Sequence, residues 1–325
     1  MGPRRHDDET ARNDGASVEA ESAASSSFVD LRDADTVDHV LDAIRPWLKR
    51  FFEPQVRGLE NLPEGAALLV ANHNAGLLMP DVFILGDAIL HQRGVEHLPY
   101  ALVHDVILRI PKLCTLMEKL GAVRAHASGA DSVFSAGKKV LVFPGGDLES
   151  MRSYRDRHRI VFGSRRGYVR LAIRHGVPLV PVVTAGAHEA FMVIDDGARI
   201  ASFLHLPQWL RVNVCPTVLS FPWGLTFGFP PPFVPVPTRI VMEFLEPIHF
   251  TRTGEEAALD AAYVEACHAE VVQAMQSALT RLAARKDVGV RARIRRRWAF
   301  AEPVGVWAER TADRIMAWTA HPQPA

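Results

Sequence analysis

Residues 68–81 read LLVANHNAGLLMPD, a short apolar run followed by a polar turn, a proline and an aspartate. The apolar run predicts a buried strand that ends at Asn72 and His73. Pro80 suits the first turn of a helix, where the helix dipole would stabilise Asp81. A histidine held by a carboxylate is the equipment of a general base, so the stretch predicts a catalytic pair at a strand end. The alternative is a buried structural histidine.

Strands and helices are predicted to alternate along most of the chain. Helical periodicity occurs, for example, at residues 80–92 and 167–175. This alternation predicts an α/β fold with a mostly parallel sheet flanked by helices. Ligands of such sheets bind at the carboxyl ends of the strands, where His73 and the turn at Gly145 and Gly146 both fall. The apolar runs typical of buried strands lie at residues 66–71, 100–103, 139–143, 178–183 and 239–245.

Composition allows one large domain or two modest ones, because the chain has 325 residues and is 48% apolar. The net charge is zero, but residues 1–35 hold nine acids against four bases, whereas residues 281–297 hold eight Lys or Arg against one acid.

The N-terminal arginines precede no apolar run, so no signal peptide is predicted. The three scattered cysteines fit neither a disulfide framework nor a CxxC metal site, which favours a reducing cytoplasm.

Three parts of the chain are predicted. Residues 1–34 are polar and lack apolar periodicity, so they are predicted to be a disordered tail. Residues 35–252 form the α/β domain, which opens with an amphipathic helix near residues 37–52. The apolar face of that helix suits either a protein core or a membrane surface. Residues 253–325 form a helical, basic, membrane-proximal segment.

The C-terminal segment is predicted to begin with an amphipathic helix. Thr253 and Glu256 have the spacing of a capping box, and Leu259 and Tyr263 fall on the apolar face of the helix that follows. The basic residues 281–297 then fit either a contact for phosphate groups or a solvated helix face.

Residues 212–237 contain no charged residue but seven prolines, which exclude a continuous membrane-spanning helix. This apolar loop, with Trp223 and Phe227, would suit insertion into a lipid interface. Alternatively, it lies buried over an edge of the sheet. No stretch of the sequence is long and apolar enough for a transmembrane helix, so a peripheral attachment to the cytoplasmic face of a membrane is predicted.

Several other kinds of active site are excluded by their missing motifs. The sequence has no G-x-S-x-G elbow, no GxxxxGK[ST] loop and no GxGxxG fingerprint after a strand. Its fourteen histidines show no HExxH or other metal-ligand spacing. A cofactor-free acid/base enzyme without a metal remains. Nucleic-acid binding by the basic segment is not expected, because no recognisable module accompanies it.

Four blocks in order resemble the glycerolipid acyltransferase superfamily (PlsC-like). NHNAGLLMPD resembles its HxxxxD block, although His73 and Asp81 here lie eight positions apart. LGAVRA at residues 120–125 occupies the place of the second block, and FPGGDLE at residues 143–149 that of FPEG. GVPLVPVV at residues 176–183 resembles the fourth block. The GGxxE pattern is similar to that of the diacylglycerol acyltransferase-like branch.

The resemblance implies an O-acyltransferase that moves a fatty acyl group from acyl-CoA or acyl carrier protein to a hydroxyl of a glycerolipid. His73 would be the general base and Asp81 the group that orients it. Backbone N–H groups at Gly145 and Gly146 would approach the oxyanion. The candidate substrate-binding residues are Arg124, Glu149, Arg159 and Arg166.

A binding function without catalysis is the alternative to an enzyme. The longer spacing after His73 also fits a catalytically inactive protein that binds lipid or acyl-CoA at a membrane surface. For Arg124, Arg159 and Arg166, a solvated surface position is the alternative to a phosphate contact.

Overall fold

The protein is described by a computed structural model over residues 31–103, 111–125, 127–197, 202, 215–228 and 233–298. Most of the predicted disordered tail, parts of the apolar loop (residues 212–214 and 229–232) and residues 299–325 lie outside these ranges. Among the described residues, no helix has both the length and the apolar character needed to cross a membrane.

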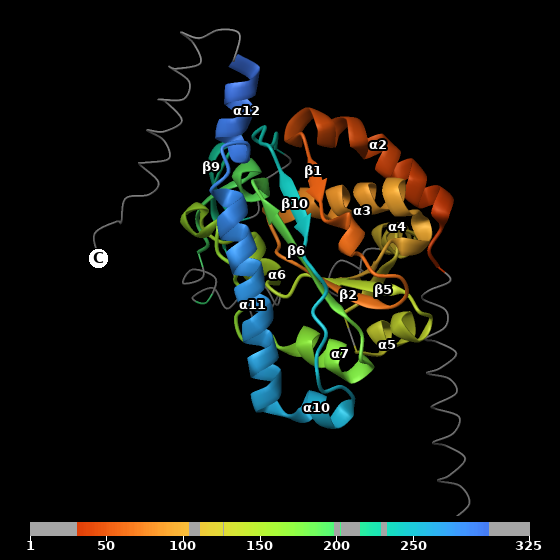
Figure 1. Ribbon diagram of the computed structural model, residues 1–325. Coiled ribbons are helices and arrows are strands. Elements are labelled where there is room, and N and C mark those ends of the chain that lie inside the picture. The colour runs from red at the N-terminus through yellow and green to blue at the C-terminus, as the bar shows by residue number, and fades with distance from the viewer. Residues whose placement is uncertain are drawn as a thin grey trace, which may run out of the picture.

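A sheet of seven strands, counted over the described residues, forms the centre of the fold (Figure 1). The strands are β1 (Gln55–Arg57), β2 (Ala67–Ala71), β3 (Tyr100–Val103), β4 (Ala122–Arg124), β5 (Lys139–Val142), β6 (Leu179–Ala185) and β10 (Val241–Phe244). Their order in the sheet is β1-β10-β6-β2-β5-β3-β4. Neighbouring strands are parallel except β10 and β6. The predicted α/β fold with a mostly parallel sheet is confirmed.

Strand β2 lies in the middle of this sheet, between β5 and β6. Its five residues are all buried, none more than 2% exposed. Leu68 and Val70 face one apolar cluster, whereas Leu69 and Ala71 face another. Burial on both faces is the physical reason for the uninterrupted apolar run. The strand therefore ends abruptly at Asn72, where the chain turns polar.

Helices cover both faces of the sheet (Figure 1). Helices α5, α7, α10 and α11 contribute to the cluster around Leu68, and α2 and α3 contribute to the one around Leu69. Helix α2 packs on α3 with Val37, Leu41 and Leu48 buried, so its apolar face serves the core. The helices are α2 (Ala34–Phe52), α3 (Pro80–Arg93), α4 (Pro111–Lys119), α5 (Ala127–Ser135), α6 (Gly146–Ser150), α7 (Gly167–His175), α10 (Glu255–Leu259), α11 (Ala261–Ala283) and α12 (Gly289–Trp298). Shorter 3-10 turns are η1 (Leu59–Asn61), η2 (Gly76–Leu78), η3 (Val95–His97), η5 (Tyr154–Asp156) and η6 (Ala187–Ala190).

The C-terminal amphipathic helix begins later than predicted. Helix α10 ends at Leu259, which is 70% exposed, and Asp260 then caps α11 by accepting hydrogen bonds from the N–H groups of Ala262 and Tyr263. The capping-box prediction at Thr253 was therefore wrong, because the Asp260 carboxylate satisfies the free N–H groups of the long helix. Helix α11 packs on β6 and buries Leu279 in the core.

The apolar loop contains two strands that were not predicted. Strands β7 (Met192–Asp195), β8 (Thr217–Ser220) and β9 (Gly224–Phe227) form an antiparallel sheet of three strands among the described residues, in the order β7-β8-β9. Its inner face buries Val193 and Val218 against the main core. Its outer face carries Leu219, Leu225 and other large apolar side chains that are exposed. The loop is therefore buried on one face of a small sheet and exposed on the other, and insertion of the exposed face into a lipid interface stays a prediction.

Candidate active site

Asn72 anchors the turn that follows β2. Its side-chain Oδ1 accepts a hydrogen bond from the N–H of Thr184 at 2.8 Å, and its Nδ2 donates to the carbonyl of the same residue at 3.0 Å. Asn72 is fully buried, so this pairing satisfies an amide that would otherwise destabilise the core. Because Thr184 belongs to β6, the bonds fix the point at which the chain leaves the sheet and presents His73.

The seven residues between His73 and Asp81 fold into a compact loop. The loop contains the 3-10 turn η2, flanked by Ala75 and Met79 with left-handed φ angles of 58° and 40°. Such a backbone costs roughly 1–2 kcal/mol at a residue other than glycine. It reverses the chain, so that α3 starts at Pro80 and Asp81 lies in its first turn, as predicted.

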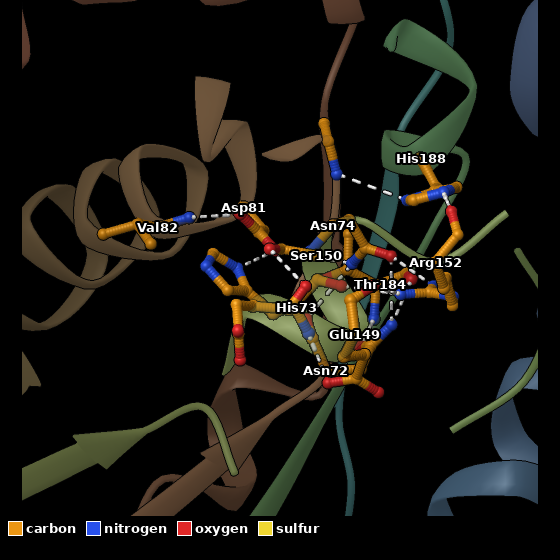
Figure 2. Close-up of polar contacts among 12 residues, drawn as sticks. Asn72, His73, Asn74, Asp81, Val82, Glu149, Ser150, Arg152, Thr184 and His188 are labelled. Carbon is orange, nitrogen blue, oxygen red and sulfur yellow. Dashed lines mark hydrogen bonds and ion pairs between the residues drawn. The ribbon is translucent and has the colours of Figure 1, made fainter. Parts of the chain in front are cut away.

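His73 and Asp81 face each other across this loop (Figure 2). Nδ1 of His73 lies 3.7 Å from Oδ2 of Asp81. This separation is an ion-pair distance and too long for a direct hydrogen bond, and Nδ1 has no hydrogen-bond partner among the described residues. The Asp81 side chain is 1% exposed, whereas that of His73 is 13% exposed. The carboxylate thus lies buried behind an imidazole that reaches the surface.

Asn74 holds the Asp81 carboxylate in place. The backbone N–H of Asn74 donates to Oδ2 of Asp81 at 3.1 Å, and the Asn74 side-chain Nδ2 approaches the same oxygen at 3.3 Å. The other Asp81 oxygen, Oδ1, accepts from the N–H of Val82 at 3.2 Å, in the first turn of α3. Donors therefore reach both oxygens of Asp81 and fix the orientation of its carboxylate.

Glu149 supports the backbone of His73 from behind. Its Oε2 accepts the N–H of His73 at 2.9 Å, and its Oε1 accepts the N–H of Val161 at 3.0 Å. Burial raises the pKa of Glu149 to about 7, although Arg152 and the two N–H donors oppose that shift. Glu149 was predicted to bind substrate, but its carboxylate is buried and fully engaged within the protein. It positions His73.

Arg152 connects the pieces of this site (Figure 2). It is only 3% exposed, and its guanidinium donates to acceptors on both sides of the turn. Because these bonds join the β2 turn to the segment after α6, Arg152 fixes one relative to the other. Its acceptors are the carbonyls of His73 (2.7 Å), Glu149 (2.6 Å), Asp156 (3.1 Å) and Arg157 (2.9 Å) and Oδ1 of Asn74 (2.7 Å).

His188 completes the buried network as a neutral imidazole. Burial lowers the pKa of His188 well below its ordinary value. The neutral ring has one donor and one acceptor. Its Nε2 lies 2.7 Å from the Arg152 carbonyl, and its Nδ1 accepts from the N–H of Ala75 at 3.4 Å. His188 therefore links Arg152 to the loop that carries η2.

Gly145 and Gly146 lie at the carboxyl end of β5, beside the end of β2, as predicted. A side chain on Gly145 would collide with Glu149, so this glycine allows Glu149 to fold back toward His73. Gly146 has a left-handed φ of 50°, and its N–H donates to the Phe143 carbonyl at 3.1 Å. The predicted oxyanion role therefore does not fit the Gly146 amide in this arrangement, and the prediction now rests on Gly145.

The three predicted substrate-binding arginines lie on different parts of the fold, at the end of β4, after η5 and at the start of α7. Arg124 is exposed at the end of β4, three strands from β2, which places it about 14 Å from the β2 end. Arg159 is 71% exposed and pairs with Asp156. Arg166 is held by Glu265 of α11 through two hydrogen bonds of 2.7 and 3.0 Å. Its ion pair joins α7 to α11, which indicates a structural role.

Arg152 and His188 were missed as site residues. The sequence places Arg152 in a run of seven basic residues, 152–166, and nothing in that run distinguishes the buried arginine from the solvated ones. His188 follows a strand end, as His73 does, but lies in none of the blocks. Among the described residues, no group of three or more His, Cys, Asp or Glu side chains is arranged to hold a metal ion. Independence from a cofactor stays a prediction.

Comparisons with known proteins agree with the sequence blocks. The Acyltransferase family model matches residues 53–185, which include β2, the loop with η2, α6 and β6. An uncharacterised protein of Mycobacterium leprae is 30% identical over 246 residues, which cover 74% of this chain and 64% of that protein. An uncharacterised protein of Mycobacterium tuberculosis is 31% identical over 223 residues, covering 67% and 58% of the two chains. The chain thus spans about three fifths of the length of these relatives.

A mouse protein named "DGAT1/2-independent enzyme synthesizing storage lipids" is 28% identical over 183 residues, which cover 56% of this chain and 53% of the mouse protein. The crystal structure of the 1-acyl-sn-glycerophosphate (LPA) acyltransferase PlsC from Thermotoga maritima matches with a TM-score of 0.48 and 18% identity, over 78% of this chain and 84% of that one. Residues 53–185 therefore match the Acyltransferase family, in agreement with the four blocks of the sequence that resemble glycerolipid acyltransferases.

Proposed function

We propose that this protein transfers a fatty acyl group from acyl-CoA or acyl carrier protein to a hydroxyl group of a glycerolipid. The observation that carries the proposal is the approach of His73 Nδ1 to the buried Asp81 carboxylate, 3.7 Å away, within a domain of an acyltransferase family. An alcohol is a poor nucleophile near neutral pH, and a positioned base that accepts its proton accelerates its attack by about 10²–10⁴-fold.

In the proposed reaction, the acceptor hydroxyl attacks the thioester carbonyl while His73 accepts its proton. Asp81 stabilises the resulting imidazolium, because its carboxylate faces Nδ1. The N–H of Gly145 donates to the oxyanion of the tetrahedral intermediate. When that intermediate collapses, the C–S bond breaks and the imidazolium returns the proton to the departing thiolate. The chain needs no covalent acyl intermediate for this sequence.

The test is a release assay with labelled acyl-CoA and a panel of lysophosphatidic acid, monoacylglycerol and diacylglycerol acceptors. We expect thiol release with at least one acceptor, and a loss of about 10²–10⁴-fold in His73→Ala. His249→Ala is the matched control, since His249 is exposed and lies outside the site. Equal rates in wild type and His73→Ala would refute the role of His73. Tight acyl-CoA binding without turnover by any acceptor would instead support the inactive lipid- or acyl-CoA-binding protein.

We further propose that the outer face of the β7-β8-β9 sheet attaches the protein to the membrane that holds its acceptor. Exposed side chains alternate with buried ones along β8 and with half-buried ones along β9, so the apolar residues share one face. Phe and Trp side chains are favoured at the interface between lipid and water. The exposed apolar residues of β8, β9 and the turn between them are Leu219 (45%), Phe221 (71%), Trp223 (52%), Leu225 (54%) and Phe227 (72%).

Flotation with liposomes tests this attachment. We expect Trp223→Ser with Phe227→Ser to reduce the membrane-bound fraction, because both side chains would leave the lipid interface. Leu259→Ser is the control, since Leu259 is equally exposed but lies on α10. If the double variant floats as well as wild type, the β7-β8-β9 face is not the attachment site.

A further inference from the structure

A separate site lies where α11 passes into α12, two helices drawn in Figure 1. It is a cavity of about 270 Å³. The segment around η5, the turn η6, the end of α11 and the start of α12 form its walls. The charged lining residues are Arg157, Glu189, Arg285, Lys286, Arg291 and Arg295.

The lining of this cavity is strongly cationic. Five of its residues carry a permanent positive charge, whereas Glu189 is its one acid. Asp287 adds a second negative charge nearby, through its ion pair with Arg285 at 2.7 Å. Burial lowers the pKa of His158 to about 4, so this histidine is neutral near pH 7. The cavity and its rim therefore hold five positive charges against two negative ones.

Arg157 lies in the wall of the cavity in a fixed orientation. Its guanidinium lies over the ring of Tyr154, 4.1 Å from the centroid, which fixes its plane. Its Nε is buried and lacks a hydrogen-bond partner among the described residues, since Oε1 of Glu189 is 3.8 Å away. The Arg157 side chain as a whole is 24% exposed and lines the cavity, so an anion there can approach the accessible part of its guanidinium.

The other explanation for these charges is that they stabilise the C-terminal end of α11 through the helix dipole. Other basic residues of the 281–297 segment already have partners outside the cavity: Arg281 pairs with Glu243, and Arg293 with Glu53. A dipole effect accounts for cations in the last turn of α11. It does not account for Arg157, which comes from a different part of the chain, or for a hollow between them.

We propose that this cavity binds a phosphate group, as a monoester or diester, at a site separate from His73 and Asp81. Arginine side chains from several directions suit a tetrahedral oxyanion, because each guanidinium donates more than one hydrogen bond. Lys286 and Arg291 lie exposed at the rim, where they attract the anion, and Arg157 receives it inside.

The cavity is joined to the active-site scaffold through two residues. The Arg157 carbonyl accepts a hydrogen bond from Arg152, which also holds the carbonyl of His73. Glu189 follows His188, whose ring contacts the Arg152 carbonyl. A phosphate bound at Arg157 would therefore touch the segment that supports His73 without entering the catalytic site.

Binding is measured on the full chain carrying His73→Ala, so that the result does not depend on acyl transfer. The soluble probe is inorganic phosphate, and its binding is measured by calorimetry. The membrane probe is a phosphatidylcholine vesicle with or without phosphatidic acid. The test variant is Lys286→Gln with Arg291→Gln, and the matched control is Lys49→Gln with Arg170→Gln, two exposed cations on α2 and α7.

We expect the test variant to bind its probe roughly tenfold or more weakly than the control, which loses the same charge. If the test variant loses binding of inorganic phosphate, the site binds a soluble phosphate. If it loses only the preference for vesicles with phosphatidic acid, the site binds a lipid headgroup. Equal binding by the test variant and the control with both probes, or no binding by wild type, would overturn the proposal. Unfolding curves of all the variants check that they fold.

Discussion

Glu149 is a single residue on which the backbone geometry of the site depends. Its two carboxylate oxygens accept the N–H groups of His73 and Val161. In Glu149→Gln, one of these N–H groups would face an amide NH₂ instead of an acceptor. We expect the free energy of unfolding to fall by about 1–3 kcal/mol and kcat to fall more than KM changes, because His73 loses its alignment. Denaturant unfolding and steady-state kinetics measure the two effects.

The same substitution changes how stability depends on pH. The pKa of Glu149 is raised from 4.5 to about 7 in the folded protein, so the folded state binds more protons than the unfolded state between these values. This residue therefore makes the free energy of unfolding decrease as the pH rises from about 4.5 to about 7. The stability difference between wild type and Glu149→Gln should narrow across this window. The control is Asp147→Asn, two positions earlier and partly exposed. The stability difference between wild type and this variant should stay constant across the same window.

Residue patterns in the sequence predicted the approach of His73 to Asp81 better than they predicted the residues that support this pair. His73 and Asp81 could be found because an apolar strand, a polar turn and a helix start leave local signals in the chain. Arg152 and His188 could not, because their roles come from burial and from contacts with residues more than 70 positions away, such as His73 and Ala75. Glu149 was singled out, but the sequence could not show that its carboxylate turns inward.

At the scale of the element, the start of α11 depends on Asp260. Its carboxylate accepts two N–H groups of the first turn and also pairs with Arg252. Asp260→Ala should lower the free energy of unfolding, since those N–H groups lose their acceptor. Thr253→Ala, at the cap position that the sequence suggested, should have a much smaller effect. A larger loss at Thr253 in denaturant titrations would restore the capping box.

Short strands are the elements that the sequence did not predict. Strand β1 has three residues, and β8 and β9 have four each in a region rich in prolines. Strands of this length show little alternation, and prolines argue against sheet structure. Strand β8 forms because Val218, together with Val193 of β7, completes the core from one side, which is tertiary information.

For the molecule as a whole, the alternation of strands and helices was enough to predict the class of fold but not the direction of every strand. Strand β10 runs antiparallel to β6 and parallel to β1, and its apolar sequence would suit either direction. The position of α11 was also beyond prediction from an amphipathic pattern. Its buried residues join the same cluster as Leu68, so the predicted C-terminal segment contributes to the core of the α/β domain.

The loop with η2 shows that the number of residues between His73 and Asp81 does not determine the distance between their side chains, although a sequence motif treats the two as one. The gap between His73 and Asp81 is set along the chain, but their approach is set by where β2 ends and α3 begins. The additional residues form a loop between the end of β2 and the start of α3. The length of this loop can vary while both ends keep their positions. Searches that demand a fixed four-residue gap will pass over chains of this kind, and a criterion based on the strand end and the helix start will retain them.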